Sequence, residues 1–181
     1  MKVRIDFHGP FRVSTGRAAA GANDTVDDLD LLPASSLKGV MRASAALLLP
    51  ERKELLDAVF GAARRPSRWH WSGATVQDVP VVTQRARIAI DPNTGAARKN
   101  HLLFAEEIWA RTASFSVTRT GPLTADDERT HLTVLACAAA GVHALGADRR
   151  RGLGWVTCTP LDPPVDDELL ARFEDLRSRD A

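Results

Sequence analysis

The chain has 181 residues, of which 44% are hydrophobic and 26% are charged, and its formal net charge is +1. These totals are typical of one globular domain that buries its core without disulfides or a structural metal. No apolar run reaches the roughly 18 residues that a membrane span needs, and the first residues lack the apolar block of a secretory signal. We therefore expect a single domain over 1–181 in the cytoplasm, with no membrane partner.

The N-terminal segment predicts a strand followed by a long loop. Residues 2–14 begin by alternating Val3, Ile5 and Phe7 with charged side chains, the period of a half-buried strand. About twenty residues without periodicity follow over 15–34, and a connector of this length is uncommon unless it has a task. This loop contains four acidic side chains, which are Asp24, Asp27, Asp28 and Asp30.

A helix is predicted over 35–49, continuing or followed by a second over 51–61, with Ser35 and Ser36 at the N-cap position. Lys38 and Arg42 share one face of its first two turns, where the helix dipole disfavours cations by about 0.3 to 1 kcal/mol. We therefore expect a bound anion there, unless an aspartate of the preceding loop folds back to neutralise them. Gly39 adds to this expectation, since a glycine inside a helix usually marks a close backbone approach.

The middle of the chain predicts strands separated by a long hairpin. Strand patterns occupy 70–82, 83–91 and 109–121, and a Pro-Asn-Thr-Gly turn lies within 91–100. Arg85 and Arg87 alternate with other residues and so form a basic strand face. Trp69 and Trp71 also share a face, and we favour burial over stacking on a nucleic acid base. The hairpin is therefore expected as an insertion over about 80–110.

The C-terminal third predicts a helix, a strand and a final helix. Thr124 is the expected N-cap of a helix over 124–145, and a strand follows over 152–161. Cys137 and Cys158 fall in these two elements without metal-ligand spacing, so both are expected to be buried thiols. A helical tail over about 164–181 completes an α+β chain. Its core order βαββαβ is that of ferredoxin-like and RNA-recognition-motif folds.

A triple-arginine loop connects the predicted helix at 124–145 to the strand that follows it. Gly146 is placed to cap the helix, while Gly152 and Gly154 allow a partner to approach the backbone. Guanidinium groups and backbone N–H groups together suit phosphate oxygens. The alternative is that these arginines only complement the helix dipole. The phosphate-binding residues expected here are Arg149, Arg150, Arg151, Gly152 and Gly154.

Three segments together carry a family resemblance. "LPASSLKGVMR", "RIAIDPNTGAARKNHLLFAEEIW" and "GADRRRGLGWV" occur in this order. They resemble the RAMP (repeat-associated mysterious protein) superfamily of CRISPR-associated proteins. The similarity is greatest to the guide-RNA-binding backbone subunits of type III effector complexes, and it spans residues 1 to about 160.

The resemblance implies a ferredoxin-like core with a thumb-like hairpin, assembled along guide RNA with copies of itself and other effector subunits, and facing complementary target RNA. The helix start and the arginine loop would form one basic cradle for the RNA backbone, which gives position rather than base specificity. The RNA-contacting residues that follow are Ser35, Ser36, Lys38, Arg42, Arg85, Arg87, Arg149, Arg150, Arg151, Gly152 and Gly154.

The resemblance also implies a catalytic candidate. Nuclease-active relatives need an aspartate on the loop after the first strand for metal-dependent cleavage of target RNA, and Asp24 in "GANDTV" is the best match. It would hold Mg²⁺ or another divalent cation at the scissile phosphate. Asp27, Asp28 and Asp30 are rivals in a loop shorter than is typical. The alternatives are a non-catalytic tip or capping subunit that only binds guide RNA, or a ferredoxin-like module for a small anion.

Overall fold

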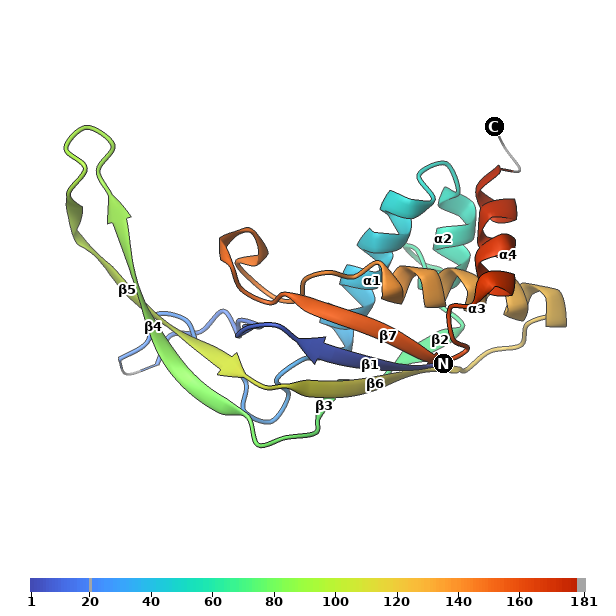
Figure 1. Ribbon diagram of the computed structural model, residues 1–181, viewed down its shortest axis with the longest axis horizontal. Coiled ribbons are helices and arrows are strands. Elements are labelled where there is room, and N and C mark those ends of the chain that lie inside the picture. Colours follow the sequence, from blue (N-terminus) through green and yellow to red (C-terminus); the bar gives the residue numbers. More distant parts are fainter. Residues whose placement is uncertain (20, 179–181) are drawn as a thin grey trace.

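The computed structural model describes residues 1–19 and 21–178, and these form a sheet, four helices and a long two-stranded hairpin (Figure 1). In chain order the elements are β1 (Lys2–Phe7), α1 (Ala34–Leu48), α2 (Lys53–Phe60), β2 (Trp69–Trp71), β3 (Thr75–Val76), β4 (Val81–Ile90), β5 (Ala97–Trp109), β6 (Thr112–Arg119), α3 (Ala125–Ala140), the 3₁₀ turn η1 (Arg149–Arg151), β7 (Val156–Asp162) and α4 (Asp167–Ser178).

The main sheet has the strand order β2-β6-β1-β7, and each neighbouring pair is antiparallel. If β1, β2, β6 and β7 are counted as the core strands one to four, this order, taken from the β7 edge, is four-one-three-two. Helix α1 connects the first to the second, and α3 connects the third to the fourth. The predicted ferredoxin-like βαββαβ core is therefore confirmed, with β3 as a short additional strand on β6.

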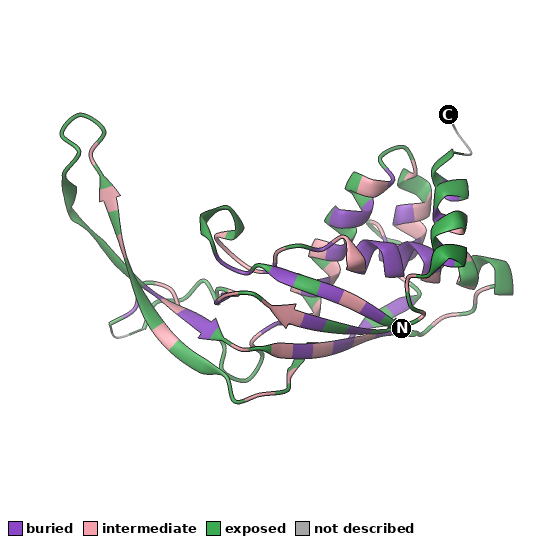
Figure 2. Cartoon of the chain, viewed as in Figure 1, coloured by how far each residue is buried: buried purple, intermediate pink, exposed green. Residues whose placement is uncertain are grey.

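The core lies between the sheet and the helices. In Figure 1 the helices cover one side of the sheet, and in Figure 2 the buried positions gather between the two layers. Val3 and Ile5 of β1 are fully buried, as the alternating pattern predicted. Trp69 and Trp71 are also buried, which confirms burial over exposure for both indoles.

Both cysteines behave as the sequence predicted. Cys137 in α3 and Cys158 in β7 are buried free thiols. Burial raises the pKa of Cys137 to about 11 and that of Cys158 to about 12, so neither is a reactive thiolate at neutral pH.

The predicted hairpin insertion is present as β4 and β5, which pair from Val81 with Trp109 to Ile90 with Ala97 and extend beyond the end of the sheet (Figure 1). Ile108, at its base, is fully buried and pairs with Phe11, which follows β1. Farther along, Ile88 and Leu102 are 55% and 54% exposed. The hairpin is thus anchored at its base and carries exposed apolar side chains beyond it.

Several predicted boundaries were wrong. The first strand ends at Phe7 rather than at residue 14, because the chain leaves β1 there and Phe11 pairs instead with the hairpin. The segment 70–82 divides into two short strands on β6. Helix α3 begins after Thr124 as predicted, with the Thr124 hydroxyl accepting from the Asp127 N–H, but it ends at Ala140 with Gly141 as C-cap. Gly146 therefore does not cap this helix.

Within the part of the chain that the structure describes, no helix is long and apolar enough to cross a bilayer.

Candidate nucleic-acid interface

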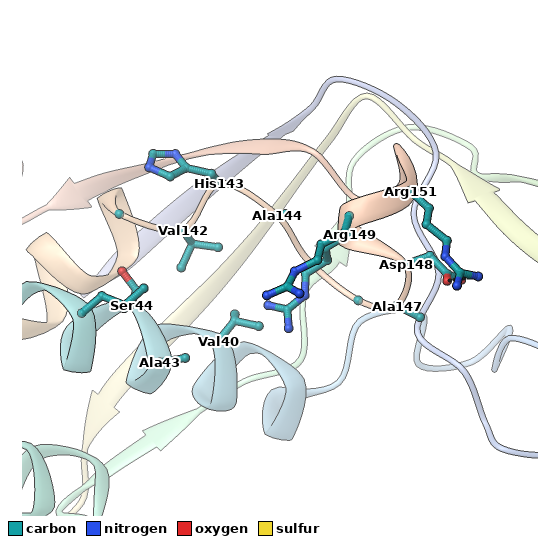
Figure 3. Close-up of a pocket in the computed structure, with 14 residues that line it drawn as sticks. Val40, Ala43, Ser44, Val142, His143, Ala144, Ala147, Asp148, Arg149 and Arg151 are labelled. Carbon is teal, nitrogen blue, oxygen red and sulfur yellow. Dashed lines mark ion pairs between the residues drawn. The ribbon is translucent and has the colours of Figure 1, made fainter.

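The arginine loop and α1 enclose a groove of about 750 Å³. One wall consists of Val40, Ala43, Ser44 and Leu47 of α1, and the other is the segment 141–151. Figure 3 shows Arg149 directed across the groove toward Val40, whereas Arg151 lies with Asp148 on the other side of the loop. All three arginines are exposed, and among the described residues neither Arg149 nor Arg150 has a carboxylate partner.

Two of the loop's three glycines, Gly146 and Gly154, are required by the protein's own backbone. Gly146 and Gly154 have φ of 76° and 73°, and a Cβ on either would collide with a backbone carbonyl oxygen, of Arg12 and Leu145 respectively. Gly152, with φ of 83°, has nothing within 4 Å of its Cβ position. The protein itself therefore fills the space at the Cβ position of Gly154, whereas the space at Gly152 is open. Contact of either glycine with RNA stays a prediction.

The start of α1 differs in detail from the predicted serine cap. Pro33 is the N-cap, without a side-chain cap bond, and the helix already includes Ser35 and Ser36 in its first turn. Proline lacks an N–H and has a fixed φ, so it suits the start of a helix. The helix therefore begins after Pro33, without a serine side chain as its cap. Ser35 is exposed at this end of the helix, and no acidic residue lies in the first turn.

A second groove of about 610 Å³ lies on another face of α1, between this helix, α2 and the turn that follows α2. Its cationic residues are Lys38, Arg42, Lys53 and Arg65, and among the described residues that line it the one acid is Asp57. The Lys38 ammonium lies 5.2 Å from the centre of the Trp71 ring, which supports it by a cation–π interaction.

Arg42 is the most constrained of these cations. It donates to Asp57 Oδ1 and to the Gly61 carbonyl oxygen, each over 2.7 Å. The alternative to a bound anion was neutralisation by an aspartate of the 24–30 loop. Arg42 instead pairs with Asp57, because α2 lies beside α1. Arg42 nevertheless keeps about half of its side chain exposed.

The two grooves are separate, so the expected single cradle is not formed as predicted. Their α1 residues lie on different faces of the helix, because 3.6 residues per turn rotate Lys38 and Arg42 away from Val40 and Leu47. The ridge between the grooves is formed by two small exposed residues, Gly39, which lines the second groove, and Ala43, which lines the first. This ridge is low, and nothing lies within 4 Å of a Cβ at Gly39.

Arg85 and Arg87 of the hairpin make ion pairs within the protein. Arg85 donates to both carboxylate oxygens of Glu107, over 2.6 and 3.2 Å, and the side chain of Glu107 is only 7% exposed. This hydrogen bonding raises the pKa of Arg85. Arg87 donates to Asp148. Both arginines of the predicted basic face of the hairpin are therefore in ion pairs within the protein.

Asp24 lies beside the base of the hairpin. Its carbonyl oxygen accepts from the Glu106 N–H over 3.0 Å, and its carboxylate accepts from the Ser14 hydroxyl. The second carboxylate oxygen lies 3.3 Å from Arg12 Nε. Asp24 therefore has a guanidinium, rather than a second carboxylate, as its charged neighbour.

The fit of a divalent cation at Asp24 is partial. Across residues 1–19 and 21–178, no group of three His, Cys, Asp or Glu side chains is placed to hold a metal. A carboxylate has further lone pairs after two contacts, and Mg²⁺ often takes only one or two protein carboxylates with phosphates and water. Asp24 would thus be a single protein ligand, and the nearby Arg12 opposes the cation's charge.

Sequence reasoning missed three residues that organise the interface, namely Arg12, Asp57 and Asp148. Asp148 directly precedes the three arginines. An acidic residue beside a basic run could have indicated an ion pair with the loop. Arg12 is 97% removed from solvent, yet the sequence around it reads as an ordinary strand. Its partners come from distant segments, so no local pattern identifies it.

The fold combines a ferredoxin-like core with a long hairpin. Its arginine loop presents Arg149 and Arg150, which have no carboxylate partner among the described residues, to a groove along α1. These features define the class of protein. The RAMP superfamily model matches residues 4–157. The chain therefore belongs to the RAMP superfamily, in agreement with the resemblance carried by its three segments.

Solved structures show the same fold. A chain of the cryo-EM structure of the Type III-B Cmr-beta bound to cognate target RNA is 13% identical, with a TM-score of 0.70 over 87% of this chain and 95% of that one. A chain of the apo-state Type III-B Cmr-beta structure is 12% identical, with a TM-score of 0.67 and the same shares. A comparison with curated protein sequences gave no match.

Proposed function

We propose that this chain is a guide-RNA-binding subunit of a type III CRISPR effector complex. Its family and the two Type III-B Cmr-beta chains of the same fold support this assignment. The main support for RNA binding comes from the arginine loop. Arg149 and Arg150 have no carboxylate partner within the described chain, and Arg149 points into the groove along α1 (Figure 3). Unpaired guanidinium groups beside an open groove are suited to phosphate oxygens.

In this proposal one RNA strand uses both grooves. Its backbone lies against Arg149 and Arg150 in the first groove, crosses α1 over the low ridge at Gly39, and reaches Lys38 in the second. Lys53 and Arg65 extend the same contact toward α2. Backbone contacts of this kind fix the position of the guide, while base pairing with target RNA supplies the sequence specificity.

The hairpin is proposed as the thumb that interrupts the duplex of guide and target. Its exposed Ile88, Ile90 and Leu102 provide apolar contact for an unstacked base. Arg85 and Arg87 contribute less to RNA binding in this proposal, because their charges already face Glu107 and Asp148.

RNA titrations at several salt concentrations test the binding proposal. Wild-type protein is expected to bind long single-stranded RNA more tightly than short oligonucleotides, with affinity that falls steeply as salt rises. The double variant Arg149→Gln with Arg150→Gln should reduce the slope by about 0.7 for each lost phosphate contact. Arg129→Gln is the matched control, since Arg129 pairs with Asp126 on the exposed surface of α3. Equal losses in both variants, or affinity independent of RNA length, would contradict the proposal.

Cleavage of target RNA through Asp24 is the further part of this proposal. Asp24 would be the protein ligand of a divalent cation that neutralises charge at the scissile phosphate. The ion pair with Arg12 and the lack of a metal-binding cluster among the described residues favour the second candidate, a subunit that binds guide RNA without cutting.

The assembled complex with guide and target RNA discriminates between these candidates. If this subunit cuts, Asp24→Asn abolishes magnesium-dependent cleavage, and Asp28→Asn, in the same loop, leaves it unchanged. Cleavage that is absent in wild type, or unaffected by Asp24→Asn, assigns the chain to the non-catalytic class.

A further inference from the structure

Asp148 receives guanidinium groups from three separate parts of the chain. Arg12 follows β1, Arg87 belongs to the hairpin strand β4, and Arg151 belongs to the arginine loop itself. The first two donate to Asp148 Oδ2, and Arg151 Nη1 lies 3.9 Å from Oδ1. One carboxylate therefore joins the core, the thumb and the arginine loop.

Arg12 extends this network to the acidic loop. Its side chain is 4% exposed, and its Nε lies 3.3 Å from Asp24 Oδ2, so the buried guanidinium has a carboxylate on each side. Its carbonyl oxygen also accepts from the Ala147 N–H over 2.7 Å, directly before Asp148. The backbone and the side chain of Arg12 thus both hold the start of the arginine loop.

The backbone of Asp148 adopts a conformation that is unfavourable for most residues with a side chain. Asp148 has φ of 56° and ψ of 26°, in the left-handed region that glycine and asparagine adopt more readily. The hydrogen bond from Arg87 and the charges of Arg87, Arg12 and Arg151 lower the pKa of Asp148, against the effect of partial burial. The carboxylate is therefore ionised at neutral pH, within a network that uses its charge.

We propose that Asp148 is a positioning residue, which fixes the arginine loop relative to the thumb so that both meet one RNA at a defined separation. This inference rests on the proposed RNA-binding function. In this proposal Asp148 acts through Arg87 and Arg12 rather than by contact with the RNA. Two of the three guanidinium groups on it come from outside the loop, so it links separate segments rather than only closing a local turn.

The variant Asp148→Asn tests the proposal, because two explanations predict opposite changes in its affinity for RNA. Asparagine has the same shape and tolerates the left-handed conformation, so the backbone of the loop is retained. A purely electrostatic view predicts tighter RNA binding, because a negative charge beside the arginines is removed. The positioning role predicts weaker binding, by about three- to tenfold, because Arg87 and the loop lose their common anchor.

Distance measurements separate this inference from the proposed function. Spin labels on Thr94→Cys at the thumb turn and Ala46→Cys on exposed α1 report the thumb's orientation without RNA. Asp148→Asn should broaden their distance distribution, while Glu128→Gln, which breaks the remote pair with Arg119, should not. If wild type fails to bind RNA, the proposed function fails, but a broadened distribution still supports the coupling. An unchanged distribution, or RNA binding as tight as wild type in a folded Asp148→Asn protein, overturns the inference.

Discussion

Trp69 donates its indole N–H to Nδ1 of His131 over 3.0 Å, in the buried space between β2 and α3. An accepting Nδ1 requires the imidazole to carry its proton on Nε2 alone, so the hydrogen bond exists only with neutral His131. Burial lowers the pKa of His131, with the positive charge of Arg68 adding to this and Asp127 opposing it.

This hydrogen bond predicts a pH dependence of stability. The pKa of His131 is lower in the folded protein than in the unfolded chain. At pH values near and below the ordinary pKa of histidine, the unfolded chain therefore binds more protons than the folded protein. The free energy of unfolding should therefore fall as pH drops through about 6.5, the ordinary value of histidine. Urea titrations between about pH 5.5 and 7.5 measure this slope. His131→Gln should flatten the slope and the exposed His70→Gln should not; equal slopes in all three proteins would disprove the role of His131.

Gly39→Ala should stabilise the protein and weaken RNA binding. A Cβ at this position meets nothing within 4 Å, and alanine is favoured over glycine inside a helix by about 1 kcal/mol. If RNA crosses α1 here, the added methyl group on the ridge hinders its close approach. Thermal unfolding and RNA titration on the same sample measure both effects. A stabilised variant with unchanged RNA affinity would show that the strand does not pass over Gly39.

The loop glycines should differ in their tolerance of alanine. Gly146→Ala and Gly154→Ala place a methyl group against the carbonyl oxygens of Arg12 and Leu145, whereas Gly152→Ala meets only open space. Gly152→Ala should cost about 1 to 2 kcal/mol for the left-handed conformation, and the other two substitutions should cost clearly more. Chemical denaturation gives this ranking, and a Gly154→Ala protein as stable as Gly152→Ala would contradict it.

Arg85→Gln should affect the stability of the thumb more than RNA binding. The substitution leaves the buried Glu107 carboxylate without its ion-pair partner, which increases local opening at the thumb base. Amide exchange of β4 and β5 should therefore speed up, while the salt dependence of RNA binding stays close to that of wild type. Arg150→Gln is expected to show the reverse pattern. A salt dependence reduced equally by both changes would place Arg85 directly on the RNA.

The elements that the sequence predicted correctly depend on local chemistry. The alternation of Val3 and Ile5, the Thr124 cap and the turn within 91–100 each act over a few residues, so their patterns survive in the structure. Boundaries failed where another segment intervened. Phe11 continues the strand pattern of β1 but pairs with Ile108, and this contact requires the hairpin to have folded back across the chain.

The order of elements, the burial of Trp69, Trp71 and both cysteines, and the arginine loop could be predicted from the sequence, because periodicity, capping and charge clusters involve neighbouring residues. Which cations stay without a carboxylate partner depends on the tertiary structure. Arg42, Arg85 and Arg87 find carboxylates on α2, β5 and the arginine loop, while Arg149 and Arg150 find none within the described chain. Charge pairing depends on distances of a few ångströms between segments far apart in sequence, and folding alone sets those distances.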